Sequence, residues 1–271
     1  MKVSIILPAY NAQATIRRAV DSILLQTFPD FELIALNDGS TDRTGEILQS
    51  YEDRRLVVIH KPNEGLVRTL NKGLGLARGE YFARMDADDE SLPERLERQV
   101  EFLDENPEVV LVGTAVRIIT SKDRRVRRFP RRHDEIVRHI LKINPISHPT
   151  VMIRKKVLED MGGYDASVDG SLGLSSGEDY HLWVNLISRG YQLANLNIPL
   201  LKQYRGSTSI MGGWNLSFRL RRRARMRLWI KNCLNLGPTA YWTISWVLVF
   251  TVLSHYGFRL ERIINYLSEK R

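Results

Sequence analysis

The sequence predicts an α/β domain built on a largely parallel sheet, followed by a separate helical tail. Short apolar runs alternate with amphipathic runs of about ten residues, which is the pattern of βαβ units. Three of the apolar runs end in segments rich in Asp, Asn and Gly. The charge distribution separates the tail, because residues 213–271 carry 11 of the 40 Lys and Arg but 2 of the 31 Asp and Glu. We therefore expect one domain over residues 1–212 and a distinct tail over 213–271.

The first half of the domain alternates strand and helix. The run "KVSIILP" is apolar and β-branched and stops at a proline, as expected of a buried strand. Further strands are predicted over residues 31–38, 55–60, 80–86 and 108–119. The intervening segments have apolar residues at helical spacing and predict helices over 12–27, 40–51, 65–79 and 92–106. Helix-boundary preferences suggest Ser40 or Thr41 as an N-cap, Gly79 as a closing residue and Pro93 in a first turn.

The pattern loosens after residue 120. The basic run 121–133 is expected to form a solvated hairpin or loop. Residues 146–165 predict a strand, a helix and a Gly-Gly turn, and 175–191 predict a loop that enters a helix. The order of elements stays that of an α/β protein.

Polar side chains gather where three predicted strands end. They lie in "PAYN" (8–11), "NDGSTD" (37–42) and "DADD" (86–89). Because ligands of open α/β sheets bind beyond the carboxyl ends of the strands, we expect these segments to share one site. A Walker loop and a G-x-G-x-x-G motif are both absent from the sequence, which argues against NTP hydrolysis and dinucleotide binding.

Asp86, Asp88 and Asp89 place three carboxylates within four residues. Carboxylates this close repel one another unless a cation lies among them. Mg²⁺ or Mn²⁺ is a suitable cation, since such ions take one or two protein carboxylates together with substrate phosphates. An EF-hand is excluded because the loop lacks its glycine. The alternative is a solvated acidic turn that caps the following helix, and at this point both interpretations stay open.

Other polar residues extend the candidate site. Asp38 follows a strand and can accept hydrogen bonds from a base or a ribose, and Arg68 can neutralise a phosphate. The adjacent acids Glu178 and Asp179 begin a predicted helix far along the chain. One of them would act as a general base if the fold brings it to the strand ends. The alternative is that both only stabilise the start of the helix.

The segments "VSIILPAYNAQATIRRAVDSILLQT", "NDGSTDRT", "NEGLVRTLNKGLGLARGEYFARMDADD" and "GEDYHLW" occur in this order. In these motifs the chain resembles the family-2 inverting glycosyltransferases of the GT-A fold, of the kind that make bacterial polysaccharides and glycolipids. The resemblance covers about residues 1–210. It implies a Rossmann-like, mostly parallel mixed sheet flanked by helices, and a metal-dependent transfer of sugar from a nucleotide sugar with inversion.

The resemblance also implies a role for each matching residue. The nucleobase would be lined by Pro8, Ala9, Tyr10 and Asn11 and would form a hydrogen bond with Asp38. Arg68 would lie near the nucleobase or the phosphates, and Asp86 would contact the ribose. Asp88 would ligate Mg²⁺ or Mn²⁺, and Asp179, the second acid after Glu178, would be the catalytic base.

Arg205 matches a loop that closes over the diphosphate, but the Q-x-x-R-W motif of processive synthases is absent. A single addition is therefore expected. His148 either faces the acceptor or metal side or is structural.

The tail suggests contact with a membrane. A basic run over 218–231 precedes 232–258, which contain no Lys, Arg, Asp or Glu. Because both flanks of the apolar run are positive, we expect it to lie in the interface or to re-enter with both flanks cytosolic. A buried core helix or a homodimer contact is the alternative. Nucleic acid is not expected as a partner, because no groove-reading or stacking module is visible.

The compartment expected is the cytoplasm, with the enzyme peripheral at the inner face of the cell membrane. The start of the chain does not have the form of a signal peptide, and the single Cys233 fits a reducing compartment. The expected reaction moves a sugar from a UDP- or dTDP-linked donor to a hydroxyl of a glycan or lipid-linked acceptor. Two alternative functions are a non-catalytic nucleotide-sugar-binding scaffold and a metal-dependent nucleotidyltransferase that would release pyrophosphate.

Overall fold

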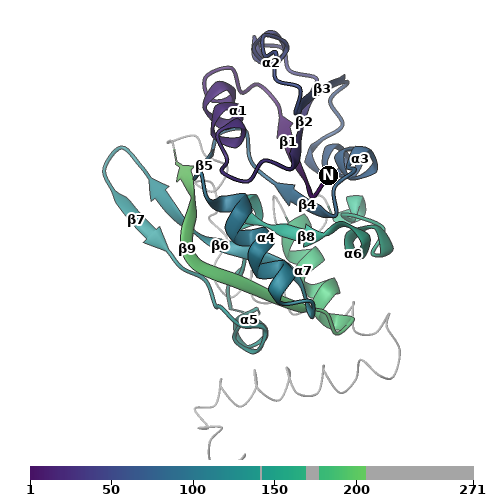
Figure 1. Cartoon of the computed structure of the whole chain (residues 1–271), viewed down its shortest axis with the longest axis vertical. Coiled ribbons are helices and arrows are strands. Elements are labelled where there is room, and N and C mark those ends of the chain that lie inside the picture. Colours follow the sequence, from purple (N-terminus) through teal and green to yellow (C-terminus); the bar gives the residue numbers. More distant parts are fainter. Residues whose placement is uncertain (141, 169–176, 206–271) are drawn as a thin grey trace, which may run out of the picture.

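A computed structural model describes residues 1–140, 142–168 and 177–205. In these ranges a nine-stranded sheet runs through the centre of the molecule, in the order β3-β2-β1-β4-β8-β6-β9-β5, with β7 paired to β6 (Figure 1). Strands β3, β2, β1 and β4 are parallel to their neighbours. Beyond them β8 is antiparallel to both β4 and β6, and β9 is parallel to β6. The expected mixed α/β sheet is therefore confirmed.

The predicted strands and helices are present, and the strand predicted over 31–38 coincides with β2. The strands are β1 (Val3–Ala9), β2 (Phe31–Asp38), β3 (Leu56–Lys61), β4 (Tyr81–Arg84), β5 (Glu90–Ser91), β6 (Val109–Ile119), β7 (Arg124–Arg127), β8 (Met152–Arg154) and β9 (Gln192–Tyr204). The helices are α1 (Ile16–Leu24), α2 (Thr44–Gln49), α3 (Leu66–Leu76), α4 (Arg95–Glu105), α5 (His133–His139), α6 (Lys155–Asp160) and α7 (Glu178–Ser188), with 3-10 turns η1 (His148–Thr150) and η2 (Ala166–Val168).

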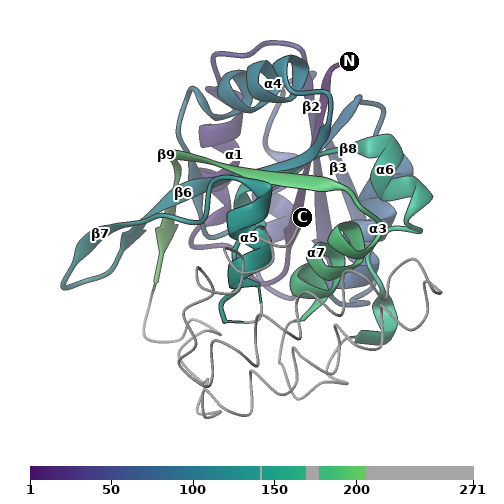
Figure 2. The same cartoon turned by 90° about the horizontal axis from the view of Figure 1, so that it is seen from below.

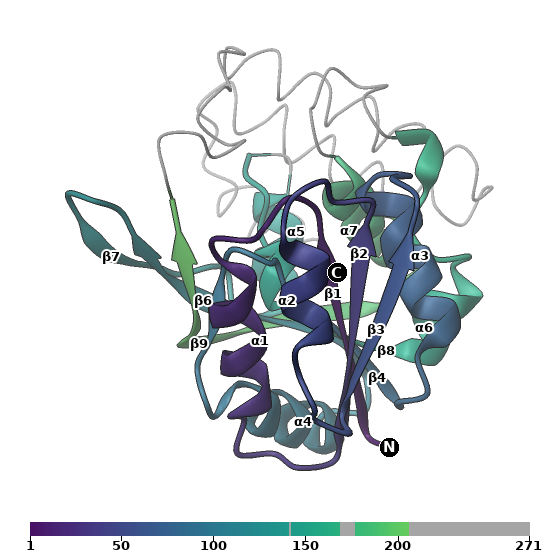
Figure 3. The ribbon, with the colours of Figure 1, turned by 90° about the horizontal axis from the view of Figure 1, so that it is seen from above.

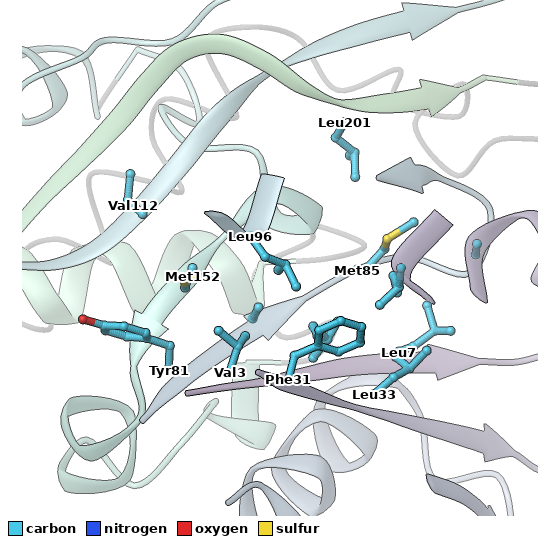
Figure 4. Close-up of a cluster of buried hydrophobic side chains, with 14 of the residues drawn as sticks. Val3, Leu7, Phe31, Leu33, Tyr81, Met85, Leu96, Val112, Met152 and Leu201 are labelled. Carbon is cyan, nitrogen blue, oxygen red and sulfur yellow. The ribbon is translucent and has the colours of Figure 1, made fainter. Parts of the chain in front are cut away.

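Helices cover both faces of the sheet (Figure 3). Alternate residues of a strand point to opposite faces, so β1 contributes to two separate cores. Val3, Ile5 and Leu7 pack with α1, α2 and α4, whereas Ile6 packs with α3, α5, α6 and α7. Figure 4 shows the first of these cores, in which side chains of β1, β2, β4, α4 and β9 meet. The two cores hold the carboxyl ends of β1 to β4 in fixed positions.

The strand β9 was not predicted from the sequence. Its residues, "QLANLNIPLLKQY", combine Asn and Pro with apolar residues and do not alternate in a regular way. Its pairing with β6 shifts register around Ala115, which lies opposite Pro199. A proline cannot donate to a sheet ladder and is tolerated at such a bulge. Because the pairing is irregular, the sequence of β9 lacks the alternation of apolar and polar residues by which a strand is predicted.

Two predicted helix boundaries are wrong. The helix α2 begins at Thr44 and not after Ser40 or Thr41, because the backbone N–H groups of Ser40 and Thr41 bond to the side chains of Asn37 and Asn11. Likewise α3 ends at Leu76, three residues before Gly79. Gly79 instead lies against β1, where an added Cβ would stand 2.5 Å from the Ser4 nitrogen.

The basic run 121–133 was expected to be a hairpin or a loop, and residues 124–127 of it form a hairpin with β6. Among the described residues β7 pairs with β6 alone, and the hairpin projects from the body of the molecule (Figures 1 and 2). Among the residues described, none of the helices combines the length and the apolar character needed to cross a bilayer. The predicted tail over 213–271 lies outside the described residues.

Candidate active site

The loops that follow β1 and β2 are held together by hydrogen bonds. Asn11 adopts a left-handed conformation with φ of 48°, and its backbone N–H donates to Ser40 Oγ at 3.0 Å. Its side-chain Oδ1 accepts from the Thr41 N–H at 2.9 Å. Pro8 and Ala9 end β1 beneath this junction, and Tyr10 is 54% exposed. Two of the three expected polar segments therefore meet, with an aromatic ring free to contact a ligand.

Asp38 organises a third loop, which follows β3. Its carboxylate pairs with Lys61, whose side chain is 1% exposed, and accepts the Glu64 and Gly65 N–H groups at 3.0 Å each. Burial alone would raise the pKa of Asp38, but the Lys61 ammonium and the backbone donor lower it below its usual value. Arg68 is exposed in the first turn of α3, directly after this loop. A direct bond from Asp38 to a base stays a prediction.

Asp86, Asp88 and Asp89 follow β4 and offer carboxylate oxygens that all lie within 4.8 Å of one another. Asp86 is 32% exposed, Asp88 is exposed, and Asp89 is buried with 1% exposed. Among the described residues the Asp89 Oδ2 atom has no hydrogen-bond partner. The three carboxylates thus form one compact cluster at the end of β4, beside the loops of β1 and β2.

The cluster carries more negative charge than its surroundings neutralise. Desolvation and the neighbouring Asp86 raise the pKa of Asp88, and burial together with both neighbours raises that of Asp89 well above its usual value. Hard oxygen donors and unbalanced negative charge are what Mg²⁺ and Mn²⁺ require. The residues present therefore fit a divalent cation.

Arg84 belongs to the candidate site, and the sequence analysis missed it. Its side chain is 3% exposed, and its guanidinium forms two hydrogen bonds to Asp86, one of them Nη1 to Oδ2 at 3.2 Å. It also interacts electrostatically with Glu178, which starts α7. An arginine inside the apolar strand "YFAR" was the available signal, because a charge in a buried strand needs a partner.

The acids Glu178 and Asp179 occupy the first turn of α7 and differ in exposure. Glu178 is 5% exposed, whereas Asp179 is half-buried. Glu178 Oε1 lies 3.4 Å from His148 Nδ1, and Asp179 Oδ2 accepts the Asn144 side-chain amide at 2.6 Å. Of the two acids, Asp179 is the more exposed.

The pKa values of the two acids move in opposite directions. Burial raises the pKa of Glu178, but the hydrogen bond and the charge of His148 outweigh it and leave the pKa below its usual value. Burial raises the pKa of Asp179, the charge of His148 opposes it, and the net shift is upward. Titratable pairs whose environments separate their pKa values are typical of acid–base sites.

His148 lies against the acid pair, with Nδ1 at 3.4 Å from Glu178 Oε1. It is 7% exposed, its Nε2 lies 3.1 Å from the Tyr164 hydroxyl, and its ring meets the Trp183 ring edge-on at 5.9 Å between centroids. Contact of His148 with an acceptor stays a prediction.

The end of β9 is tied to the acidic cluster through Arg18 of α1. The Arg18 guanidinium stacks on the Tyr204 ring at 3.8 Å and donates to the Asp88 carbonyl at 2.6 Å. Tyr204 in turn donates to Glu90 at 2.6 Å. Arg205 follows Tyr204 and interacts electrostatically with Asp89, so the expected phosphate-binding arginine lies on the side of the cluster. The sequence analysis did not identify Arg18.

Comparison with known proteins identifies relatives of this chain. A family model described as glycosyl transferase family 2 matches residues 4–162. The amylovoran biosynthesis glycosyltransferase AmsE of Erwinia amylovora is 30% identical over 220 residues, covering 78% of this chain and 80% of that protein. An uncharacterized glycosyltransferase of Haemophilus influenzae is 34% identical over 213 residues, covering 74% of this chain and 64% of the relative. The chain thus spans less than two thirds of the second relative.

Two solved structures are similar in fold. TarS of S. aureus, residues 1–349 in complex with UDP-GlcNAc, has a TM-score of 0.73 at 22% identity. The match covers 96% of this chain and 74% of the TarS chain. The mannosyltransferase PcManGT of Pyrobaculum calidifontis, in complex with GDP-Man and Mn²⁺, has a TM-score of 0.59 at 17% identity. The match covers 99% of this chain and 79% of the PcManGT chain. With the family model matched over more than half of the chain, the protein belongs to glycosyl transferase family 2 and has the GT-A fold.

Proposed function

We propose that this glycosyltransferase moves one sugar from a UDP- or dTDP-linked donor to a hydroxyl of a glycan or lipid-linked acceptor, with inversion at the anomeric carbon. The observation that carries the proposal is the pair of acidic sites joined by Arg84. The cluster over Asp86–Asp89 suits a diphosphate with its cation, and Asp179 suits a base. A displacement with inversion needs these two functions on different groups.

The donor would be held by the joined loops at the strand ends. Pro8 to Asn11 and the loop built by Asp38 would enclose the nucleoside, and Asp86, fixed by Arg84, would accept from the ribose. Arg68 and Arg205 would face the phosphates. TarS binds UDP-GlcNAc and PcManGT binds GDP-Man, so the neighbours support a nucleotide-sugar donor without selecting the base.

Asp88 would hold the divalent cation, with Asp89 supporting the turn through its N–H bond to the Asp86 carbonyl at 3.3 Å. When bound, such a cation neutralises charge that develops on the leaving diphosphate. The cation is Mg²⁺ or Mn²⁺.

Asp179 would take the proton of the acceptor hydroxyl while the hydroxyl oxygen forms its bond to the anomeric carbon. The bond from that carbon to the diphosphate oxygen breaks in the same step, and the nucleoside diphosphate leaves with the electron pair. An upward pKa shift strengthens Asp179 as a base. Glu178 stays charged beside His148 and contributes to that shift.

The name of AmsE, an amylovoran biosynthesis glycosyltransferase, supports a polysaccharide or glycolipid product. Delivery to such an acceptor would be the task of residues 213–271, which we propose bind the inner face of the cell membrane. A basic run beside an uncharged aromatic-rich run motivates this part of the proposal.

A donor panel tests the proposal. Membrane fractions containing the enzyme are supplied with UDP-, dTDP- and GDP-sugars and with Mg²⁺, Mn²⁺ or a chelator. The expected result is metal-stimulated release of nucleoside diphosphate, a product whose anomeric configuration is opposite to that of the donor, and loss of metal stimulation in Asp88→Asn. Release of pyrophosphate from an NTP would favour a nucleotidyltransferase instead. Donor binding without release would favour a non-catalytic scaffold.

A further inference from the structure

The proposed base is held by an amide whose orientation is fixed. Asn144 lies in the segment between α5 and η1 and is half-buried. Its Nδ2 donates to Asp179 Oδ2 at 2.6 Å, and its Oδ1 accepts from Trp183 Nε1 at 3.1 Å. Because an indole N–H only donates, Trp183 requires the amide oxygen on its side. The amide nitrogen must therefore face Asp179.

The segment that carries Asn144 is anchored on both sides. The Tyr180 hydroxyl donates to the Ile140 carbonyl at 2.9 Å, and the Asn195 amide of β9 donates to the Pro145 carbonyl at 3.1 Å. Both Tyr180 and Asn195 are buried, with 3% and 4% exposed. A hydrogen-bond donor on such a support keeps its place without loss of side-chain entropy when a substrate arrives.

From these contacts we infer that Asn144 is a positioning residue that orients the Asp179 carboxylate for proton transfer, with Trp183 setting the direction of its amide. The inference rests on the proposed role of Asp179 as the base. A neutral amide suits this task better than a cation would. It holds Oδ2, while Oδ1 accepts the Tyr180 backbone N–H at 2.6 Å and keeps a second lone pair for the acceptor proton. An arginine or lysine in its place would lower the pKa of the base too far.

Several charged or titratable groups surround Asp179 in the described part of the chain. Glu178 belongs to the same helix, His148 comes from η1 and Tyr164 from the loop after α6. Arg84 of β4 acts through Glu178. Since replacement of Asn144 leaves all four in place, a change in the pH profile reports the amide contact itself.

The test compares pH–rate profiles of kcat/KM for the full chain and for Asn144→Ala. Loss of a hydrogen bond to a charged carboxylate is expected to move the acidic limb up by about one pH unit. Asn144→Asp places a second carboxyl group there and is expected to move the limb further. The donor KM is expected to stay unchanged. Asn106→Ala is a matched control, because this half-buried amide donates only to the Phe102 carbonyl at the end of α4.

Trp183→Phe provides a second variant, which keeps an aromatic ring but removes the N–H that sets the amide together with part of the buried ring volume, so its fold is checked by denaturant unfolding. It is expected to move the limb in the same direction by a smaller amount. A reduced rate with an unmoved acidic limb in both variants would overturn the positioning role. The proposed function fails separately, since it is contradicted if Asp179→Asn transfers sugar at the normal rate.

Discussion

At the scale of single residues, Arg84 connects the two acidic parts of the site. It is a buried cation that holds Asp86 through two hydrogen bonds and faces the charge of Glu178. A buried charge is tolerated only when it is paired. Arg84 therefore couples the stability of the fold to the geometry of the proposed donor and base sites.

Replacing Arg84 tests this connection. Arg84→Met leaves Asp86 without its partner and is expected to lower the free energy of unfolding by about 3–5 kcal/mol. Arg84→Lys keeps the charge but loses the paired hydrogen bonds, so it is expected to fold and to raise the donor KM. Denaturant unfolding and steady-state kinetics measure the two effects. Arg98→Lys, whose ion pairs are exposed, serves as control. A normal donor KM in Arg84→Lys would contradict the link.

Asp38 makes a stability prediction with a defined pH dependence. Asp38→Asn removes the buried anion of Lys61 and leaves it only the half-exposed Glu64 carboxylate at 2.8 Å, so we expect a loss of about 3 kcal/mol at neutral pH. Because the folded-state pKa of Asp38 lies below its ordinary value of 3.8, its contribution is present above that value and is lost as the pH falls through the folded pKa. The unfolding curves of variant and parent should therefore converge below about pH 4.

Thermal and denaturant unfolding between pH 3 and pH 7 checks the Asp38 prediction. Asp30→Asn is the control, since Asp30 is exposed and its ion pair within the described residues is with the chain terminus at 3.7 Å. A constant difference between Asp38→Asn and the parent across this range would contradict the pairing.

The sequence pointed to some residues of the candidate site and not to others, for physical reasons. Asp38, Asp86 and Asp88 were found because they follow strands, and the carboxyl ends of parallel strands meet. Asn144 and Arg18 were missed because a single Asn or Arg in a loop or helix has no distinguishing pattern. Their importance depends on contacts with Asp179 and Tyr204, which are 35 and more than a hundred residues away along the chain.

At the scale of elements, α3 offers a matched pair of glycines. A Cβ on Gly73 would stand 2.5 Å from the Ile6 side chain of β1, whereas one on Gly75 would meet nothing within 4 Å. Gly73→Ala is therefore expected to destabilise by about 1–3 kcal/mol through overpacking. Gly75→Ala is expected to stabilise by about 0.5–1 kcal/mol, because alanine favours the helix. Equal effects of the two substitutions in denaturant unfolding would contradict the packing of α3 on β1.

Elements with a clear periodicity were predicted, and β9 and α5 were not. The run 31–38 is apolar and bounded, so its prediction coincided with β2. In β9 the register shift opposite Pro199 removes the alternation on which a strand prediction depends. Helix ends were the least predictable, since Gly79 is required for its contact with Ser4 and not as a cap.

At the scale of the whole molecule, we propose that the basic tail over 213–271 brings the neutral domain over 1–212 to the membrane. We expect deletion of residues 213–271 to shift the protein from the membrane to the soluble fraction, because each arginine near anionic lipid contributes on the order of 1 kcal/mol. Fractionation of cells that express the two forms measures the shift. Unchanged partition would contradict a role of the tail in membrane binding.

The most direct test of the central claim is sugar transfer by Asp179→Asn, measured alongside donor binding. A general base contributes about 10²–10⁴-fold, so transfer is expected to fall by at least about 10²-fold. The dissociation constant of the donor is expected to stay within about twofold, since Asp179 belongs to α7 and not to the donor loops. Asp160→Asn, an exposed acid of α6, should behave as the parent. Transfer by Asp179→Asn at the parental rate would contradict the account.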